Sequence, residues 1–151
     1  MIERGHGHLV YTSSVAATTG QPGVSVYCST KGGLTRFAES VRMELKNTGI
    51  GVTILHLGPI ATEMWQRVED DPGFEKGVQR AMKLGLFAVA PVDEVATATL
   101  VAVQKNKREV RLPKRMAGGV SLNGANTRTY EAVYRGIDPR VEHGKAPTKT
   151  D

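Results

Sequence analysis

The chain has 151 residues, of which 40% are hydrophobic and 23% charged, a composition typical of one globular domain. Its single cysteine, Cys28, excludes an internal disulfide framework and fits a reducing compartment, so we expect a cytoplasmic protein. The sequence has no run of about 18 apolar residues, which predicts that it contains no membrane span.

Much of the net charge of +5 comes from residues 105–115. Such a patch can bind nucleic acid or anionic lipid. It can also be a solvated helix end whose cations complement the helix dipole. We favour the second interpretation and expect no nucleic-acid partner. The cations concerned are Lys105, Lys107, Arg108, Arg111, Lys114 and Arg115.

The first predicted element is a short strand over residues 8–13, followed by a loop over residues 17–23 that ends in Pro22-Gly23. A long helix is predicted over residues 25–47, because its apolar residues recur at spacings of three and four. Gly49 would then stop that helix. The apolar residues of the helix are Leu34, Phe37, Ala38, Val41 and Leu45.

Residues 50–57 are almost all apolar, as is typical of a strand buried on both faces of a parallel sheet. The irregular stretch after them is expected to hold one or two short helices, over residues 63–69 and 73–84. Pro91 suits the first position of a further helix, and residues 109–112 predict a strand that Pro113 ends. The stripe of that helix expected to be buried is Val92, Val95, Ala96, Thr99, Leu100 and Val103.

This alternation of strands and helices predicts an α/β fold, with a parallel sheet of about three strands joined by crossover helices. Residues 1–121 would form this region. Residues 122–151 would be a weakly structured basic tail, with a short helix over 127–135 and disorder from 138 onward.

Tyr27 and Lys31 lie four residues apart, so a helix places both side chains on one face. One positive charge at about 4–5 Å, at an effective dielectric of about 20, stabilises a phenolate by roughly 3–4 kcal/mol. Bringing a phenol pKa from about 10 to about 7 needs roughly 4 kcal/mol. One lysine is therefore nearly enough to make a tyrosine a proton donor and acceptor at neutral pH.

The run Ser13-Ser14-Val15-Ala16, followed by Tyr27-Cys28-Ser29-Thr30-Lys31-Gly32-Gly33, resembles the catalytic segment of the short-chain dehydrogenases/reductases. The run Gly58-Pro59-Ile60-Ala61-Thr62-Glu63-Met64 resembles the turn that follows the next strand in that family. Order and spacing agree over roughly residues 5–115. Leu57 departs from the pattern, because the family usually has a proline there, and the rigid φ of proline is lost.

The resemblance implies hydride transfer between a nicotinamide cofactor, NAD or NADP, and a carbonyl or alcohol carbon. Tyr27 would exchange a proton with the substrate oxygen, which Ser14 would hold, and Lys31 would assist the tyrosine. No metal is implied. The residues that would bind the cofactor are Tyr27, Lys31, Gly58, Pro59, Ile60 and Thr62, with the Ile60 backbone and the Thr62 hydroxyl on the carboxamide.

The family's glycine-rich turn, which binds the dinucleotide phosphates at a helix N-terminus, has no counterpart in these residues. The choice between NAD and NADP is therefore not readable. The chain resembles the C-terminal half of the family's doubly wound Rossmann-like sheet, and we expect a truncated fragment that is inactive alone. The family also implies a homo-oligomer for the full-length protein.

The stretch after Thr62 corresponds to the family's substrate lid and is fairly apolar. It favours a hydrophobic carbonyl or alcohol substrate, although the same residues could simply pack the lid. The apolar residues are Met64, Trp65, Val68, Phe74, Met82, Leu84, Leu86 and Phe87.

Three other functions are weaker. A hydrolase using Ser14 would need a G-x-S-x-G motif, which is absent. A metal site at His6, His8 and His56 would lack a carboxylate or cysteine to complete its ligands. The alternative that stays open is a non-catalytic interaction fragment or pseudo-enzyme, which would not need a cofactor.

Overall fold

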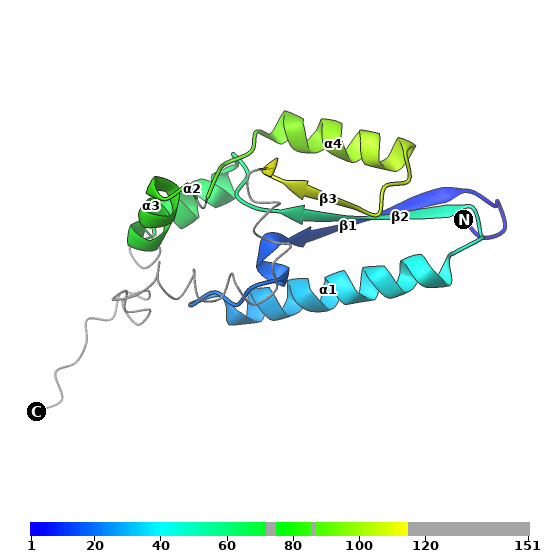
Figure 1. Ribbon diagram of the computed structural model, residues 1–151, viewed down its shortest axis with the longest axis horizontal. Helices are drawn as coiled ribbons and strands as arrows, with labels where there is room; N and C mark the ends of the chain where they lie inside the picture. The colour runs from blue at the N-terminus through cyan, green and yellow to red at the C-terminus, as the bar shows by residue number, and fades with distance from the viewer. Residues whose placement is uncertain (72–74, 86, 115–151) are drawn as a thin grey trace, which may run out of the picture.

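The computed structural model describes residues 1–71, 75–85 and 87–114. In this part of the chain, β1 (Gly7–Ser14), β2 (Ile50–Leu57) and β3 (Glu109–Leu112) form a parallel sheet in the order β1-β2-β3. Helix α1 (Ser25–Glu44) covers one face of the sheet and α4 (Val92–Gln104) covers the other (Figure 1). The predicted α/β fold, with three parallel strands and crossover helices, is confirmed.

Strand β2 lies at the centre of the sheet, and only its last residue, Leu57, is not fully buried. Helices on both faces explain why its sequence is a continuous apolar run rather than an alternation. Val52, Ile54 and Leu55 are 0%, 1% and 4% exposed and form the middle of the core. The predicted bounds of β2 and β3 are confirmed, and β1 is one residue longer at each end than predicted.

Helix α1 ends at Glu44, three residues before the predicted end. Asn47 and Gly49 follow with φ of 72° and 77°, left-handed values that a right-handed helix cannot contain. A Cβ on Gly49 would overlap the carbonyl oxygen of Gly5. Gly49 therefore shapes the turn into β2, and the helix stops before it.

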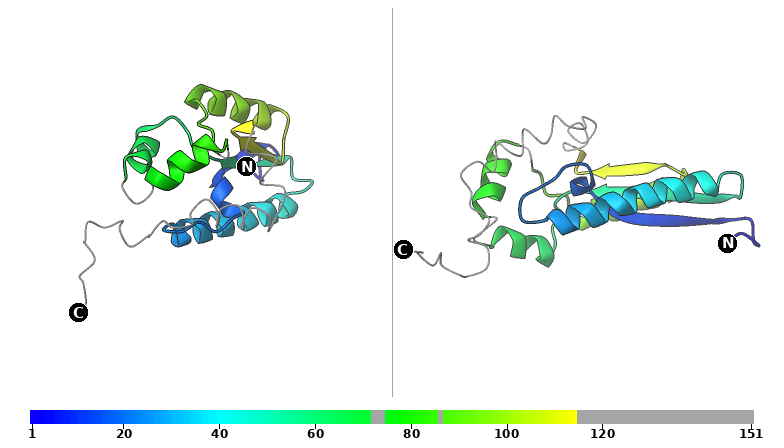
Figure 2. Two further views of the ribbon diagram at one scale, coloured as in Figure 1. Left: turned by 60° about the vertical axis from the view of Figure 1, so that its left-hand side comes forward. Right: turned by 90° about the horizontal axis from the view of Figure 1, so that it is seen from below.

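Helices α2 (Glu63–Glu69) and α3 (Glu75–Lys83) lie beyond the carboxyl ends of the strands (Figures 1 and 2). The bounds of α2 match the prediction. Helix α3 ends one residue before its predicted end, and residues 73 and 74, where it was predicted to begin, lie outside the described residues. The backbone N–H of Ala61 donates to the carbonyl of Ala90, and the N–H of Ala90 donates to the carbonyl of Pro59, at 2.9 and 3.0 Å. The segment that carries both helices thus starts and ends at one point beside the sheet.

The buried stripe predicted for α4 is partly wrong. Val92 and Leu100 are 51% and 64% exposed, and Ala96 is also exposed, whereas Ala102 is fully buried. The helix rests on β2 and β3 through the other side of its apolar surface, so residues at i, i+4 and i+8 face outward. Pro91 is the N-cap of α4 and not its first residue.

The predicted helix over 127–135, the predicted tail and the boundary after residue 121 lie outside the described residues. Phe74, Leu86 and Arg115 do so as well. Among the helices that the structure describes, none combines the length and the apolar character needed to cross a membrane.

Candidate active site

Ser14 is the last residue of β1 and is only 5% exposed. Its Oγ accepts a hydrogen bond of 3.1 Å from the backbone N–H of Ala16, which makes Ser14 the N-cap of the short 3-10 helix η1 (Val15–Ala17). Ser14 pairs in register with Leu57, the last residue of β2. The serine therefore lies at the carboxyl edge of the sheet, and its hydroxyl orientation is fixed by the cap.

Tyr27 and Lys31 lie in the first two turns of α1, the end of the helix that reaches this same edge (Figure 1). The Lys31 ammonium is 5.7 Å from the centre of the Tyr27 ring. A cation at this distance over an aromatic face is within the attractive range. Tyr27 is 44% exposed, so a substantial part of this residue is in contact with solvent.

Two consecutive residues of β1 hold Lys31. The Lys31 Nζ donates a 2.9 Å hydrogen bond to the carbonyl oxygen of Thr12, and the hydroxyl of Ser13 donates to the carbonyl oxygen of Lys31 at 3.1 Å. These contacts fix the helix against the strand that ends in Ser14. Sequence reasoning missed Thr12 and Ser13, because one acts through its backbone and the other could be read as an ordinary polar strand end.

The turn after β2 is held by a backbone hydrogen bond at its start and by hydrogen bonds of the Thr62 hydroxyl at its end. The N–H of Gly58 donates to the carbonyl of Leu112 at 2.7 Å, at the end of β3. The Thr62 hydroxyl donates to the carbonyl of Ile60 at 3.3 Å and accepts the N–H of Trp65 at 3.4 Å, as the N-cap of α2. The candidate cofactor residues are thus brought to the same edge as Ser14.

Leu57, the departure from the family pattern, is the last residue of β2. It pairs with Ser14 on one side and with Leu112 on the other. The leucine therefore continues the strand up to the turn, where a proline would have removed a backbone donor.

The apolar residues described in the stretch after Thr62, which was expected to be a substrate lid, differ in their exposure. The rings of Trp65 and Phe87 meet edge to face at 6.2 Å, and Phe87 packs against Val15, the neighbour of Ser14. Met64 and Leu84 are 73% and 62% exposed. Part of this stretch therefore packs beside the candidate site, and part presents an apolar surface outward.

His56 is buried on β2, with its Nε2 3.3 Å from the carboxylate of Glu109 on β3. Burial lowers the pKa of His56, and Arg111 acts in the same direction, while Glu109 raises it. Burial, followed by the charge of Arg42, also lowers the pKa of His8, whose Nε2 lies 2.8 Å from the Thr53 hydroxyl. The described residues contain no group of three histidine, cysteine or acidic side chains placed to hold a metal ion.

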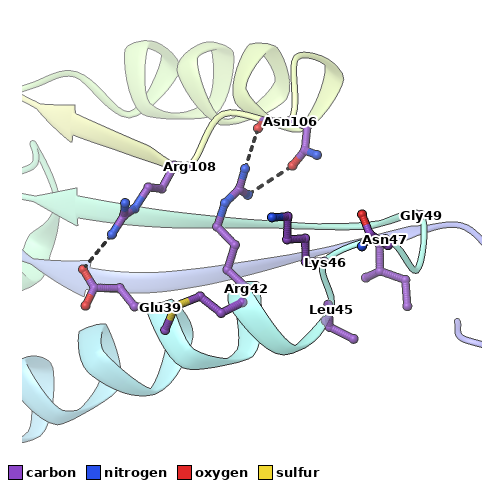
Figure 3. Close-up of a pocket in the computed structure, with 10 residues that line it drawn as sticks. Glu39, Arg42, Leu45, Lys46, Asn47, Gly49, Asn106 and Arg108 are labelled. Atoms are coloured by element: carbon purple, nitrogen blue, oxygen red, sulfur yellow. Dashed lines mark hydrogen bonds and ion pairs between the residues drawn. The ribbon is translucent and has the colours of Figure 1, made fainter.

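A pocket of about 600 Å³ lies at the opposite, amino end of the strands (Figure 3). Arg42 of α1 lines the pocket and donates three hydrogen bonds. One goes to the carbonyl of Val52, and two, at 3.1 and 3.2 Å, go to the side chain and the carbonyl of Asn106. Arg108 lies 3.4 Å from Glu39 across the same pocket. These cations bind the protein's own carbonyls and carboxylate, so the arrangement joins α1, β2 and the turn before β3.

Comparisons with known proteins show which proteins this chain resembles. Residues 1–73 match the family model described as short chain dehydrogenase, and all the candidate site residues fall within them. The chain is 34% identical over 116 residues to the "Uncharacterized oxidoreductase YbbO" of Escherichia coli, covering 74% of this chain and 42% of that protein. It is 31% identical over 102 residues to the 3-oxoacyl-[acyl-carrier-protein] reductase FabG of Escherichia coli, covering 68% and 38%.

A solved short-chain dehydrogenase from Streptomyces avermitilis superposes with a TM-score of 0.62 at 26% identity, covering 91% of this chain and 55% of that one. The chain spans less than half the length of the two curated relatives. The chain is thus similar to the short-chain dehydrogenases over residues 1–73 and to named oxidoreductases over about two thirds or more of its length.

Proposed function

We propose that this chain carries the catalytic residues of an NAD(P)-dependent short-chain dehydrogenase/reductase, which interconverts a carbonyl compound and an alcohol. One observation carries the proposal. The Lys31 ammonium lies over the ring of a solvent-accessible Tyr27, at the carboxyl edge of a parallel sheet where β1 ends in Ser14. Ligands of open parallel sheets bind at that edge.

In this proposal Tyr27 gives its phenolic proton to the substrate oxygen during reduction and takes it back during oxidation. Ser14 donates a hydrogen bond to the same oxygen. Its Oγ already accepts the Ala16 N–H at 3.1 Å, which leaves the hydroxyl proton for the substrate. Lys31 supplies a positive charge beside the phenol. An ammonium has three donors, so the bond to Thr12 leaves two for the hydroxyls of a ribose.

The nicotinamide end of a dinucleotide fits the residues present. The carboxamide carries a carbonyl and an amino group. In the turn over residues 58–62 the Gly58 N–H and the Pro59 carbonyl already bond to Leu112 and Ala90. The Ile60 backbone and the Thr62 hydroxyl are therefore the groups that would meet the carboxamide, with Gly58 and Pro59 shaping the turn. The Thr62 hydroxyl contacts the Ile60 carbonyl at 3.3 Å, so the two would act from one place. The hydride of the reaction is supplied or taken up by the cofactor when it is bound.

The phosphate end of a dinucleotide has no recognisable binding motif in this sequence. The 151 residues contain no glycine-rich turn between a strand and a helix N-terminus. We therefore propose that these residues are the catalytic half of the fold and require a dinucleotide-binding half for activity. On this proposal either NAD or NADP is possible, because the residues that select between them belong to the other half.

For the substrate we propose a hydrophobic carbonyl compound. Met64 and Leu84 expose apolar surface on the lid, and Trp65 and Phe87 pack beside Val15, next to Ser14. One relative is a 3-oxoacyl-[acyl-carrier-protein] reductase, and this name describes a carbonyl group on an acyl chain. We propose a homo-oligomer for the full-length enzyme, as the family resemblance implies.

The test is a chimera in which a short-chain dehydrogenase relative supplies the dinucleotide-binding half. A panel of aliphatic, aromatic and 3-oxoacyl ketones is offered with NADH and with NADPH, and cofactor oxidation is followed. Turnover that the Tyr27→Phe chimera lacks would support the proposal. A folded chimera that binds cofactor but reduces none of the ketones, or that reduces them equally well without the Tyr27 hydroxyl, would contradict it.

A further inference from the structure

Three oxygen atoms form a compact triangle between β1 and α1. The hydroxyls of Ser13 and Thr35 lie 2.7 Å apart, and they lie 3.1 and 3.0 Å from the carbonyl oxygen of Lys31. Ser13 and Thr35 are 2% and 7% exposed, so water has little access to either hydroxyl. The triangle is therefore a closed buried arrangement centred on the backbone of one residue.

The two hydroxyl protons make two of the three contacts of the triangle hydrogen bonds, in either of two directions. Ser13 can donate to the carbonyl of Lys31 while Thr35 donates to Ser13, or Thr35 can donate to the carbonyl while Ser13 donates to Thr35. In both directions each hydroxyl donates once. In either direction both hydroxyl protons have an acceptor within the triangle, so neither hydroxyl needs a hydrogen-bond acceptor elsewhere in the protein.

The helix does not need these bonds. The carbonyl of residue i in the interior of an α-helix already accepts the backbone N–H of residue i+4. Lys31 and Thr35 stand in that relation within α1. Two buried hydroxyls cost desolvation free energy, and replacing both by apolar groups of similar shape would be nearly neutral for stability. What the pair adds is a fixed position of Lys31 against β1.

That position matters because the other end of Lys31 is bound to the neighbouring residue of the same strand. The ammonium donates to the Thr12 carbonyl at 2.9 Å, while Ser13 holds the Lys31 backbone and Ser14 follows directly. A shift of α1 along β1 would break the triangle and would also move the ammonium away from Thr12. The ammonium and the backbone of Lys31 are thus fixed relative to Ser14 by the two residues that precede it, Thr12 and Ser13.

We propose that the hydroxyl pair of Ser13 and Thr35 is a positioning device for Lys31. The importance of Lys31 rests on the proposed function, but the positioning itself does not. The pair touches neither the proposed substrate oxygen nor the proposed ribose hydroxyls, and it acts only through the backbone of Lys31.

The test measures how readily the Lys31 ammonium leaves its bound position and reacts in the 151-residue chain. The chain is treated briefly with the N-hydroxysuccinimide ester of acetic acid, and mass spectrometry gives the acetylation rate of Lys31 relative to Lys46 in the same molecule. Lys46 is exposed in the turn after α1 and serves as the internal reference. The variants are Ser13→Ala/Thr35→Val, the conservative Ser13→Thr and Thr35→Ser, and Thr99→Val.

Thr99→Val is the matched control. Thr99 is a partly buried threonine on α4, and its hydroxyl donates at 2.8 Å to the carbonyl of Val95, four residues earlier. Its substitution removes the same kind of bond from another helix. Urea unfolding of every variant establishes that the chains remain folded under the labelling conditions.

The double variant is expected to acetylate Lys31 about three- to tenfold faster relative to Lys46, the range for loss of one hydrogen bond. Ser13→Thr, Thr35→Ser and Thr99→Val are expected to keep the wild-type ratio. An unchanged ratio in a folded double variant, or an equal rise in Thr99→Val, would overturn the proposal. The labelling needs no cofactor, so a failure to find turnover would count against the proposed function alone.

Discussion

The Lys31 ammonium donates a 2.9 Å hydrogen bond to the carbonyl of Thr12, two residues before Ser14. This bond ties the start of α1 to the end of β1, and it places the lysine 5.7 Å from the centre of the Tyr27 ring. The Lys31 side chain therefore contacts both Thr12 of β1 and Tyr27 of α1. The mechanistic predictions depend on this relation.

Ser14→Ala in the cofactor-binding chimera should lower kcat/KM by about 10²–10³, the usual effect of losing one donor aimed at a developing oxyanion. The variant also loses the cap of η1, because the Ser14 Oγ accepts the Ala16 N–H. Thermal unfolding should therefore be recorded beside the kinetics. Ser40→Ala is the control, since its hydroxyl donates to the Arg36 carbonyl on the exposed side of α1. An equal loss in both variants would contradict the role of Ser14.

The 151-residue chain alone should not bind NADH or NADPH tightly, because it offers no glycine-rich turn for the pyrophosphate. Cofactor fluorescence titrated with purified chain should show no saturation at micromolar concentrations. The same titration of the chimera should saturate. Saturable micromolar binding by a monodisperse sample of the chain would show that the phosphates find another site.

Stability should depend on pH through His56. Burial lowers its pKa below the ordinary value of 6.5, so the folded state favours the neutral ring. The unfolded chain then binds more protons, and the free energy of unfolding should fall as pH drops from above 6.5 through the lower folded value. The slope for one histidine cannot exceed about 1.4 kcal/mol per pH unit. Urea unfolding at a series of pH values measures it, and His56→Gln should reduce the slope.

Glu109 provides a second check of the same feature. Its carboxylate lies 3.3 Å from His56 Nε2 and raises the pKa of the ring, against the effects of burial and Arg111. Glu109→Gln should therefore lower the pKa of His56 further and extend the loss of stability to lower pH. A slope that neither His56→Gln nor Glu109→Gln alters would assign the pH dependence to other groups.

Gly49→Ala should lower the free energy of unfolding by about 1–3 kcal/mol. Its φ is 77°, where a Cβ is strained, and that Cβ would overlap the carbonyl oxygen of Gly5. Gly33→Ala is the contrasting change, because Gly33 lies inside α1 and a Cβ there meets no atom within 4 Å. It should raise stability by about 0.5–1 kcal/mol. Urea unfolding of the two variants should show shifts of opposite sign, and equal shifts would contradict this account.

Strong local patterns predicted most of the elements. The apolar run over residues 50–57 gave β2 with its correct bounds, because a strand covered on both faces has no polar alternation. The buried face of α4 was harder to predict, because this helix has apolar residues on more than one side. The choice between Leu100 and Ala102 as the buried residue depends on the sheet beneath the helix.

For the candidate site, spacing was enough to pair Tyr27 with Lys31, since i and i+4 share a face of any helix. Sequence could not show that the Thr12 carbonyl receives the ammonium, because any residue type has that carbonyl. Nor could it show that Ser13 and Thr35 meet, because their contact depends on the register between β1 and α1. Contacts between elements depend on packing, which short sequence motifs do not encode.

The most direct measurement is the turnover of the Tyr27→Phe chimera beside that of Tyr11→Phe. Both changes remove only a phenolic oxygen, and the Tyr11 ring packs edge to face against Phe37 at 5.8 Å, away from the proposed chemistry. We expect Tyr27→Phe to lower kcat for ketone reduction by about 10²–10⁴, the range for loss of a general acid. We expect it to keep cofactor affinity, and Tyr11→Phe to keep wild-type turnover. Near wild-type turnover by a folded, cofactor-binding Tyr27→Phe chimera would contradict the assignment of Tyr27 as the proton donor.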